Sequence, residues 1–207
     1  VRWVRADLTR FDETLALLGK SRPHLLFHLA ALTATPVSWK HPRQTFSLNT
    51  GGSIALLEAT LRFAPRARIV FISTSHVYGE TFFGKRRVRE SDLANPLTPY
   101  AASKLLMELA ALNFLESHLL QIVVARGFNQ VGTGQERNFI FSDFCRQIAL
   151  MEKRRRPAVL EVGNVNLVRD FIHIQDAVRA YFFLSQKGRP GEIYNVGSGR
   201  GMSLQEG

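Results

Sequence analysis

A tyrosine and a lysine four residues apart are the side chains in this sequence best placed for acid–base chemistry. Tyr100 and Lys104 bound the segment 100–104, and residues four apart share one face of a helix. Thr98 is suited to cap such a helix and Pro99 to occupy its first turn, so Tyr100 should lie where the helix begins. The helix dipole and the nearby ammonium should lower the pKa of the phenol there. Tyr100 could then exchange a proton with a substrate oxygen near neutral pH.

A strand that ends in hydroxyl groups precedes this helix. Residues 69–74 form an apolar run that closes with Ser73 and Thr74, as expected of a buried parallel strand. Open α/β sheets place their chemistry at this end of the strands. Thr74 could therefore hold the oxygen with which Tyr100 exchanges a proton, as a carbonyl requires while it receives a hydride. The competing interpretation is an exposed aromatic and a solvated lysine on an amphipathic helix.

Six further segments stand in an order that is typical of one family. With them, the chain resembles the extended short-chain dehydrogenase/reductase family of nucleotide-sugar epimerases, dehydratases and reductases. The resemblance covers nearly the whole chain. It implies an α/β fold with a doubly wound, Rossmann-like parallel sheet and a smaller substrate lobe. The six segments are 6–9, 28–31, 49–59, 126–129, 169–173 and 194–199.

The resemblance also implies a set of site residues and a cofactor, NAD or NADP. Thr74, Tyr100 and Lys104 would be catalytic, and Lys104 would also hold the nicotinamide ribose. We expect no metal site. The cofactor contacts implied are Asp7, Leu8, Leu29, Ala30, Ala31, Thr33, Asn49, Tyr100, Lys104 and Phe128, and the substrate contacts are Thr74, Ser75, His76, Asn129, Asn138 and Arg169.

Several polar residues have a structural interpretation beside the functional one. Asn129 could be a turn residue, and Arg169 could be a surface charge paired with Asp170. The resemblance makes both contacts of a substrate diphosphate, which suits the forked guanidinium. We expect His28 to be a packed core histidine. The residues expected to orient the helix that follows them are His173 and Asp176.

The residue at position 76 separates the reactions of the resembled family. Its dehydratases carry Thr-x-Glu before a Tyr-Gly pair, and that glutamate removes a proton, whereas this chain has His76. A histidine can act as a base but does not carry the charge of a carboxylate. Residues 128–135, 138–149, 162–164 and 169–171 are most similar to reductases of GDP-4-dehydro-6-deoxy-D-mannose and to near relatives of GDP-mannose 4,6-dehydratase.

We therefore expect an NAD(P)-dependent enzyme that reduces the 4-keto group of a GDP-4-dehydro-6-deoxy-hexose. A nucleotide-sugar 4,6-dehydratase or 4-epimerase is the alternative. A non-catalytic dinucleotide sensor is the hypothesis from another class, and the presence of Thr74, Tyr100 and Lys104 argues against it.

Alternating strand and helix patterns position these residues. We expect residues 1–131 to form a partial dinucleotide-binding domain, with a loop at 79–97 over the site. Residues 132–207 should form a partial substrate lobe with segments that return to the sheet. The expected strands are 1–4, 25–29, 69–73, 121–125 and 157–162, and the expected helices are 11–19, 50–63, 99–117, 139–152 and 176–186.

The glycine-rich turn that opens a dinucleotide-binding fold does not occur in the 207 residues. That turn holds the pyrophosphate at a helix N-terminus. We therefore expect the chain to start at the third strand of the family, with the first βαβ unit missing. On this interpretation the 207-residue piece folds poorly and binds a dinucleotide poorly when it is alone.

The net charge of +10 favours anionic partners. The basic residues are scattered, apart from short runs at 85–87 and 153–156 without interleaved aromatics. We therefore expect a solvated surface, and we expect the partner to be a nucleotide-diphosphate sugar, with a GDP-sugar favoured, rather than nucleic acid.

No apolar run could span a bilayer and no signal peptide opens the sequence. The sole cysteine, Cys145, excludes an internal disulfide and should be a small buried residue. We expect a cytoplasmic protein that does not bind membranes.

The helices expected at 50–63 and 99–117 carry apolar residues beyond a single stripe, such as Leu105, Leu106, Met107, Leu109 and Leu112. The resemblance implies that these two helices pair across a homodimer. Packing of the extra apolar surface under the substrate lobe is the alternative.

Overall fold

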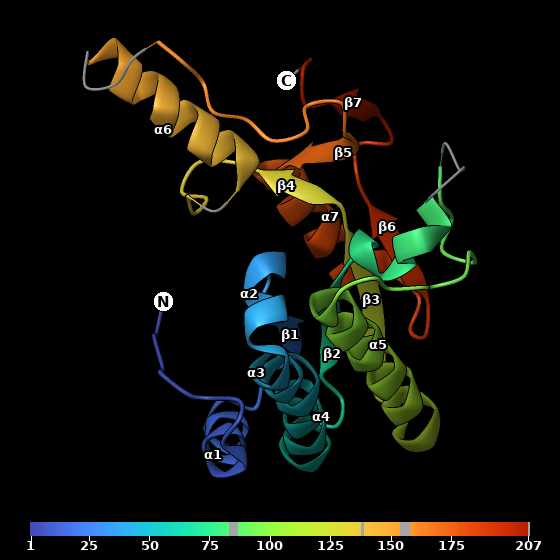
Figure 1. The fold of residues 1–207 in the computed structure, drawn as a ribbon. Helices are drawn as coiled ribbons and strands as arrows, with labels where there is room; N and C mark the ends of the chain where they lie inside the picture. Colours follow the sequence, from blue (N-terminus) through green and yellow to red (C-terminus); the bar gives the residue numbers. More distant parts are fainter. Residues whose placement is uncertain (83–86, 138, 154–157, 207) are drawn as a thin grey trace. The chain divides into compact units, whose positions relative to one another are not determined.

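The computed structural model describes residues 1–82, 87–137, 139–153 and 158–206. They form two compact units, one made of residues 1–127 and 180–196 and the other of 128–179 and 197–207. Figure 1 shows how strands and helices alternate along the chain. The basic residues 85–86 and 154–156, Pro157 and the expected substrate contact Asn138 lie outside the described residues.

A parallel four-stranded sheet is the centre of the first unit. Its strands are β1 (Leu25–His28), β2 (Arg68–Thr74), β3 (Gln121–Gly127) and β6 (Ile193–Val196), in the order β1-β2-β3-β6. Thr74 pairs with Gly127 and Gly127 with Val196. The carboxyl ends of the strands therefore share one edge, and the expected α/β fold with a parallel sheet is confirmed.

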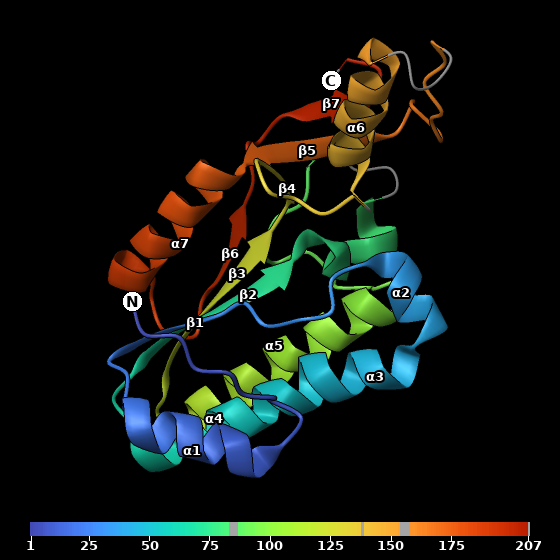
Figure 2. The ribbon, with the colours of Figure 1, turned by 90° about the vertical axis from the view of Figure 1, so that its left-hand side faces the viewer.

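Helices pack on the sheet because its central strands are apolar on both faces. α4 (Gly52–Phe63) and α5 (Pro99–His118) cover one face, while residues 180–187 of α7 (Ile174–Lys187) lie on the other (Figure 2). α1 (Phe11–Ser21) packs beside α4. The buried core between the sheet and α4 and α5 consists of Leu57, Ile69, Phe71, Met107, Ala111, Leu120, Ile122 and Val124.

A helical run that the sequence did not predict connects β1 to α4. It contains α2 (Thr35–Lys40), α3 (Pro42–Phe46) and the π-helical turn η1 (Ser47–Gly51). The prolines in α2 and α3 stand in the first helical turn, where the missing N–H costs no hydrogen bond. π-turns are rare inside helices and often occur at functional sites, and this one carries Asn49.

The segment after β2 begins as a 3-10 helix, η2 (Ser75–Phe82), rather than as the loop expected from residue 79. Gly79 interrupts η2 with φ 47°, a conformation that favours glycine. The N–H of Glu80 then donates to the carbonyl of Asn95 at 3.1 Å. This contact fastens the later part of the irregular segment, residues 87–97, to η2.

The second unit holds a three-stranded sheet in the order β4-β5-β7. β4 (Asn129–Val131) is parallel to β5 (Val168–His173), and β5 is antiparallel to β7 (Gly201–Ser203). α6 (Ile140–Glu152) and the start of α7 complete this unit.

Two of the strands predicted from sequence are wrong. Residues 1–4 form no ladder in the described chain, and Val1 and Trp3 are exposed because no neighbouring strand covers them. Residues 158–162 are irregular. The side chain of Gln147 binds both backbone groups of Glu161, at 3.0 and 2.9 Å, and thus replaces a strand partner.

The expectation that Cys145 is buried is also wrong, because its side chain is exposed. On α6 the buried residue is Gln147. Two residues correspond to about 200° around a helix, so Cys145 faces away from Gln147.

Candidate active site

The start of α5 brings Tyr100 and Lys104 into the core of the first unit. The Oγ1 of Thr98 accepts a hydrogen bond from the N–H of Ala101 at 3.1 Å, and Pro99 opens the helix. The predicted cap is thus confirmed, and Tyr100 stands in the first turn. Tyr100 is 8% exposed and Lys104 is 3% exposed, so neither belongs to a solvated helix face.

Thr74 lies at the carboxyl end of β2 and is buried. A hydrogen bond links its side chain to the phenol of Tyr100. The backbone N–H of His76 donates to the Oγ1 of Thr74 at 3.3 Å, and the imidazole lies edge-on to the ring of Tyr100, with the ring centroids 6.0 Å apart. The structure thus brings Tyr100 close to Thr74 and His76, which come before it in the sequence and belong to other elements.

The ionisation of Tyr100 differs from the expectation. Burial raises the pKa of the phenol, and the hydrogen bond from Thr74 opposes this only in part. The expected lowering of the pKa is wrong because desolvation of the buried phenol outweighs the hydrogen bond with Thr74. Burial also lowers the pKa of Lys104 to about 8, although Glu108 acts in the opposite direction. At neutral pH the pair is therefore a neutral phenol and an ammonium.

The ammonium of Lys104 has N–H donors that its contact with Met107 does not use. Its Nζ donates to the Sδ of Met107 at 3.5 Å, and a thioether is a weak acceptor. An ammonium carries three N–H donors, so this buried group suits the hydroxyls of a ribose. The donor set is thus consistent with a nicotinamide nucleotide beside Tyr100.

Asn49 joins the segment after β1 to α5. Its Oδ1 accepts from the N–H of Leu32 at 2.8 Å, and its Nδ2 donates to the carbonyl of Leu32 at 3.0 Å and to the Oγ of Ser103 at 2.9 Å. Ser103 directly precedes Lys104. The fully buried side chain of Asn49 is therefore held by protein groups, and its contact with a cofactor stays a prediction. The neighbouring residues expected along the cofactor, Leu29, Ala30 and Thr33, are exposed and Ala31 is half-buried.

Asp7 and Leu8 stand in the turn before α1. The Oδ1 of Asp7 accepts from the backbone N–H and the Oγ1 of Thr9, at 2.9 and 2.8 Å, and these hydrogen bonds lower the pKa of the carboxyl. Leu8 lies against Gly52, where an added Cβ would come within 3.0 Å of the Cβ of Leu8. Their contacts with an adenine stay predictions.

The remaining candidates belong to the second unit, where Phe128 is half-buried. The Nδ2 of Asn129 donates to the carbonyl of Asp170 at 3.1 Å, so Asn129 holds β5. Arg169 is exposed, and its Nη1 donates to the carbonyl of Val168 at 2.9 Å. Roles of Asn129 and Arg169 in diphosphate binding stay predictions.

Asp170 does not pair with Arg169 as the structural interpretation suggested. Its carboxylate accepts from the N–H and Oγ of Ser198 and from the N–H of Gly199, each at 2.8 Å. Asp170 therefore holds the loop before β7.

The predicted role of His173 at the start of the next helix is confirmed. Its Nδ1 accepts from the backbone N–H of Gln175, in the first turn of α7, at 3.3 Å. Asp176 pairs with Arg179 on the same helix at 3.2 Å, and both side chains are exposed.

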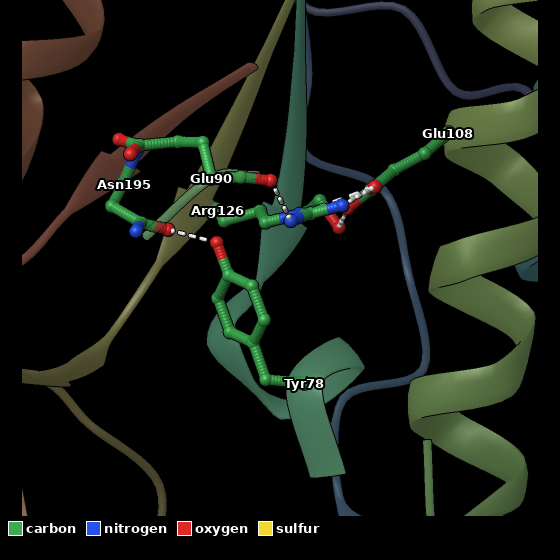
Figure 3. A network of polar contacts seen from close by, with 6 residues as sticks. Tyr78, Glu90, Glu108, Arg126 and Asn195 are labelled. Atoms are coloured by element: carbon green, nitrogen blue, oxygen red, sulfur yellow. Dashed lines mark hydrogen bonds and ion pairs between the residues drawn. The ribbon is translucent and has the colours of Figure 1, made fainter. Parts of the chain in front are cut away.

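Sequence reasoning missed the buried ion pair between Glu108 and Arg126. The Nη2 of Arg126 lies 2.7 Å from the Oε2 of Glu108, and their side chains are 5% and 1% exposed. Figure 3 shows the guanidinium between Glu108, the carbonyl oxygen of Glu90 and the ring of Tyr78. One feature of the sequence could have indicated this pair: Glu108 lies four residues after Lys104, so its carboxylate falls on the helix face that was expected to be buried.

The described residues contain neither a metal site nor a membrane-spanning helix. Within those ranges, no three or more His, Cys, Asp or Glu side chains are grouped as metal ligands would be. No helix in the described part of the chain has both the length and the hydrophobicity needed to cross a membrane.

Known proteins are similar to this chain in sequence and in fold. GDP-6-deoxy-D-mannose reductase of Pseudomonas aeruginosa is 34% identical over 202 residues, which cover 98% of this chain and 66% of that protein. Human dTDP-D-glucose 4,6-dehydratase is 27% identical over 206 residues, 98% of this chain and 56% of that protein. The solved structure of RMD from Pseudomonas aeruginosa, complexed with NADPH, superposes with a TM-score of 0.92 at 34% identity and covers 98% of this chain and 70% of that chain.

The chain therefore spans less than two thirds of the length of both curated relatives. The model of the NAD dependent epimerase/dehydratase family matches residues 1–197. On this match, and on the parallel sheet with Tyr100 and Lys104 at the start of α5, the chain belongs to the NAD dependent epimerase/dehydratase family.

Proposed function

We propose that the protein is an NAD(P)-dependent oxidoreductase of nucleotide sugars that reduces the 4-keto group of a GDP-4-dehydro-6-deoxy-hexose. The observation that carries the proposal is the burial of Thr74, Tyr100 and Lys104, with a hydrogen bond between Thr74 and Tyr100. The 34% identity to a GDP-6-deoxy-D-mannose reductase supports the substrate class.

In this proposal Tyr100 is the acid. Its raised pKa keeps the phenol protonated at neutral pH, so the proton is available for the carbonyl oxygen of the substrate. Thr74 orients that oxygen, and the ammonium of Lys104 stabilises negative charge that develops on the phenol as the proton leaves. Lys104 also holds the ribose hydroxyls of NADH or NADPH, which supplies the hydride when it is bound.

The identity of residue 76 favours reduction over dehydration. A 4,6-dehydration needs a base that removes a proton next to the keto group, whereas a reduction needs only the acid, the orienting hydroxyl and the hydride donor. His76 lies against Tyr100 and carries no carboxylate. Ser75, the other nearby substrate contact that we propose, also has no acidic group.

We further propose that the first unit holds the cofactor and that the second contributes contacts to the nucleotide sugar through Asn129 and Arg169. The protein would act in the cytoplasm as a homodimer. Leu106 and Leu109 on α5, which are 45% and 54% exposed, support an interface at this helix.

The deciding experiment compares Tyr100→Phe with the unchanged full-length protein, using NADPH and GDP-4-dehydro-6-deoxy-D-mannose. We expect kcat to fall by about 10² to 10⁴, because phenylalanine keeps the ring and loses the proton. Tyr194→Phe is the matched control, since the Tyr194 hydroxyl accepts from the N–H of Arg189 away from Tyr100. Unchanged turnover by Tyr100→Phe would refute the role of the acid.

A second assay separates reductase from dehydratase. The full-length protein is incubated with GDP-mannose without added reductant. We expect no 4-keto sugar to form, and we expect NADPH to be consumed only when the 4-keto-6-deoxy sugar is supplied. Dehydration of GDP-mannose under these conditions would exclude the reductase and favour the alternative.

A further inference from the structure

We infer that Glu108 is a positioning residue for the proposed reduction and that, with Arg126, it sets Thr74 and Lys104 in register with each other. The inference rests on the proposed function, because it concerns the same reacting groups. Neither Glu108 nor Arg126 touches Tyr100 in the contacts described above, so both would act through their neighbours.

Glu108 occupies the position where the three elements of the site meet. It lies one turn after Lys104 and two turns after Tyr100 on the buried face of α5. Ser73 on β2 and Arg126 on β3 are register partners in the sheet. The side chains of both partners reach the carboxylate of Glu108: Ser73 donates through Oγ, and Arg126 donates through Nε and Nη2.

These contacts bear directly on the reacting groups. Ser73 immediately precedes Thr74 on β2, so the hydrogen bond from Ser73 limits how far the end of β2 can move relative to α5. The same movement would change the hydrogen bond between Thr74 and Tyr100. A change of about 1 Å in such geometry can cost about 10²-fold in rate.

Further contacts hold Arg126 in one arrangement. Its Nη1 donates to the carbonyl of Glu90 at 3.3 Å, and its guanidinium lies 4.7 Å from the ring centroid of Tyr78. The Tyr78 hydroxyl donates to the Oδ1 of Asn195 at 2.8 Å, and the N–H of Asn195 donates to the Oε1 of Glu90 at 2.8 Å. In Figure 3 this closed set of contacts joins η2, residue 90 and β6 to the ion pair.

Glu108 also influences Lys104 through charge. Its carboxylate raises the pKa of the ammonium against the larger effect of burial. Replacing that carboxylate with an amide would favour the uncharged amine and would leave the guanidinium of Arg126 buried without its counter-charge. In the described part of the chain, the titratable groups near Lys104 are Tyr100 and Glu108 on α5 and His28 at the end of β1, with Arg126 of β3 paired to Glu108 and His76 of η2 beside Tyr100.

A purely structural role predicts a different result. Buried ion pairs can often be replaced by neutral side chains of similar volume without loss of stability. If Glu108 and Arg126 only stabilise the fold, a variant that folds normally should also react normally. The turnover and its pH dependence therefore distinguish the two roles, whereas stability alone does not.

The test measures kcat and KM of Glu108→Gln in the full-length protein with NADPH and GDP-4-dehydro-6-deoxy-D-mannose, from about pH 6 to about pH 10. We expect kcat to fall by about 10²-fold while KM changes by less than about threefold. The alkaline limb of the rate profile should move to lower pH. Glu116→Gln is the matched control, because Glu116 is exposed on the same helix, and it should behave as the unchanged protein does.

The double variant Glu108→Gln with Arg126→Met keeps the inference testable if the single variant folds poorly. Removal of the unpaired guanidinium should return the unfolding transition toward that of the unchanged protein, while kcat stays low and the alkaline limb stays displaced. Recovery of both kinetic properties in the folded double variant would overturn the positioning role. An active Tyr100→Phe would instead overturn the proposed function, so the two failures are distinguishable.

Discussion

The Nε2 of His28 lies 2.7 Å from the Oγ of Ser53 in the interior of the first unit. The same Oγ lies 2.5 Å from the carbonyl oxygen of Asn49, and only the Ser53 hydroxyl can supply the hydrogen between those two oxygens. Ser53 must therefore accept from His28. This assigns the neutral imidazole to the tautomer that is protonated on Nε2. Through Ser53, His28 is linked to Asn49, whose Nδ2 donates to the Oγ of Ser103, the residue before Lys104.

Neutral His28 predicts a loss of stability in acid. Burial, and secondarily the charge of Lys104, lower the pKa of His28 to about 3. Between pH 6.5, the ordinary pKa of histidine, and about pH 3, His28 is protonated in the unfolded chain but not in the folded chain. The free energy of unfolding therefore falls as pH falls. The expected slope is about 1.4 kcal/mol per pH unit.

Urea unfolding of the full-length protein and of His28→Gln between about pH 7 and about pH 4 measures this contribution. Glutamine does not titrate, so its stability should depend less steeply on pH. Parallel curves for the two proteins would show that His28 takes up its proton in the folded state as readily as in the unfolded state.

The pKa of Lys104 predicts the alkaline limit of the proposed reduction. The reaction needs a neutral Tyr100 and a charged Lys104. Since the pKa of Tyr100 is raised and that of Lys104 is lowered to about 8, the ammonium is lost first. We expect kcat/KM to fall as pH rises through about 8.

Lys104→Arg tests this assignment, because a guanidinium keeps its charge throughout the range. At neutral pH the variant should be slower than the unchanged protein, since arginine does not match the geometry of lysine, and its alkaline limb should disappear. An unchanged limb would assign the pH dependence to another group.

Gly79 should be intolerant of any side chain. Its φ of 47° disfavours other residues, and an added Cβ would lie 1.9 Å from the carbonyl oxygen of Asn95. Gly79→Ala should lower the free energy of unfolding by at least about 2 kcal/mol and weaken the hold on residues 87–97. Gly134→Ala is the control in thermal unfolding: Gly134 has φ 87°, and an added Cβ there meets no atom of the described residues within 4 Å. This variant should therefore show only the cost of the backbone conformation. Equal losses in the two variants would exclude a role for the Asn95 contact.

Adjacent residues on β5 should have separable effects. Asp170→Asn removes an acceptor from the loop at Ser198 and Gly199, and we expect it to lower the free energy of unfolding by about 1 to 3 kcal/mol. Arg169→Ala should leave stability within about 0.5 kcal/mol, because its side chain is exposed. It should raise the KM for the GDP-sugar if the guanidinium binds the diphosphate. An unchanged KM would remove Arg169 from the proposed substrate contacts.

Short-range patterns predicted much of the fold. The continuous apolar run of β2 indicated a buried strand, and α5 was predicted from its cap and first-turn proline at Thr98 and Pro99. The helical run from 35 to 51 was missed because its prolines, which often end helices, stand here in first turns. The strand expected at 157–162 was wrong over its described residues because Gln147 supplies the partner that a strand would need.

The sequence by itself determined strands β1, β2 and β3, helices α1, α4 and α5, the cap of α5 and the spacing that places Tyr100 and Lys104 on one face. These features depend on neighbours within a few residues. Only the tertiary structure decided how the groups are charged and held: burial raises the pKa of Tyr100, and Glu108 meets Arg126, 18 residues away. Desolvation and ion pairing depend on side chains that packing brings together from distant positions, and a local pattern does not contain that information.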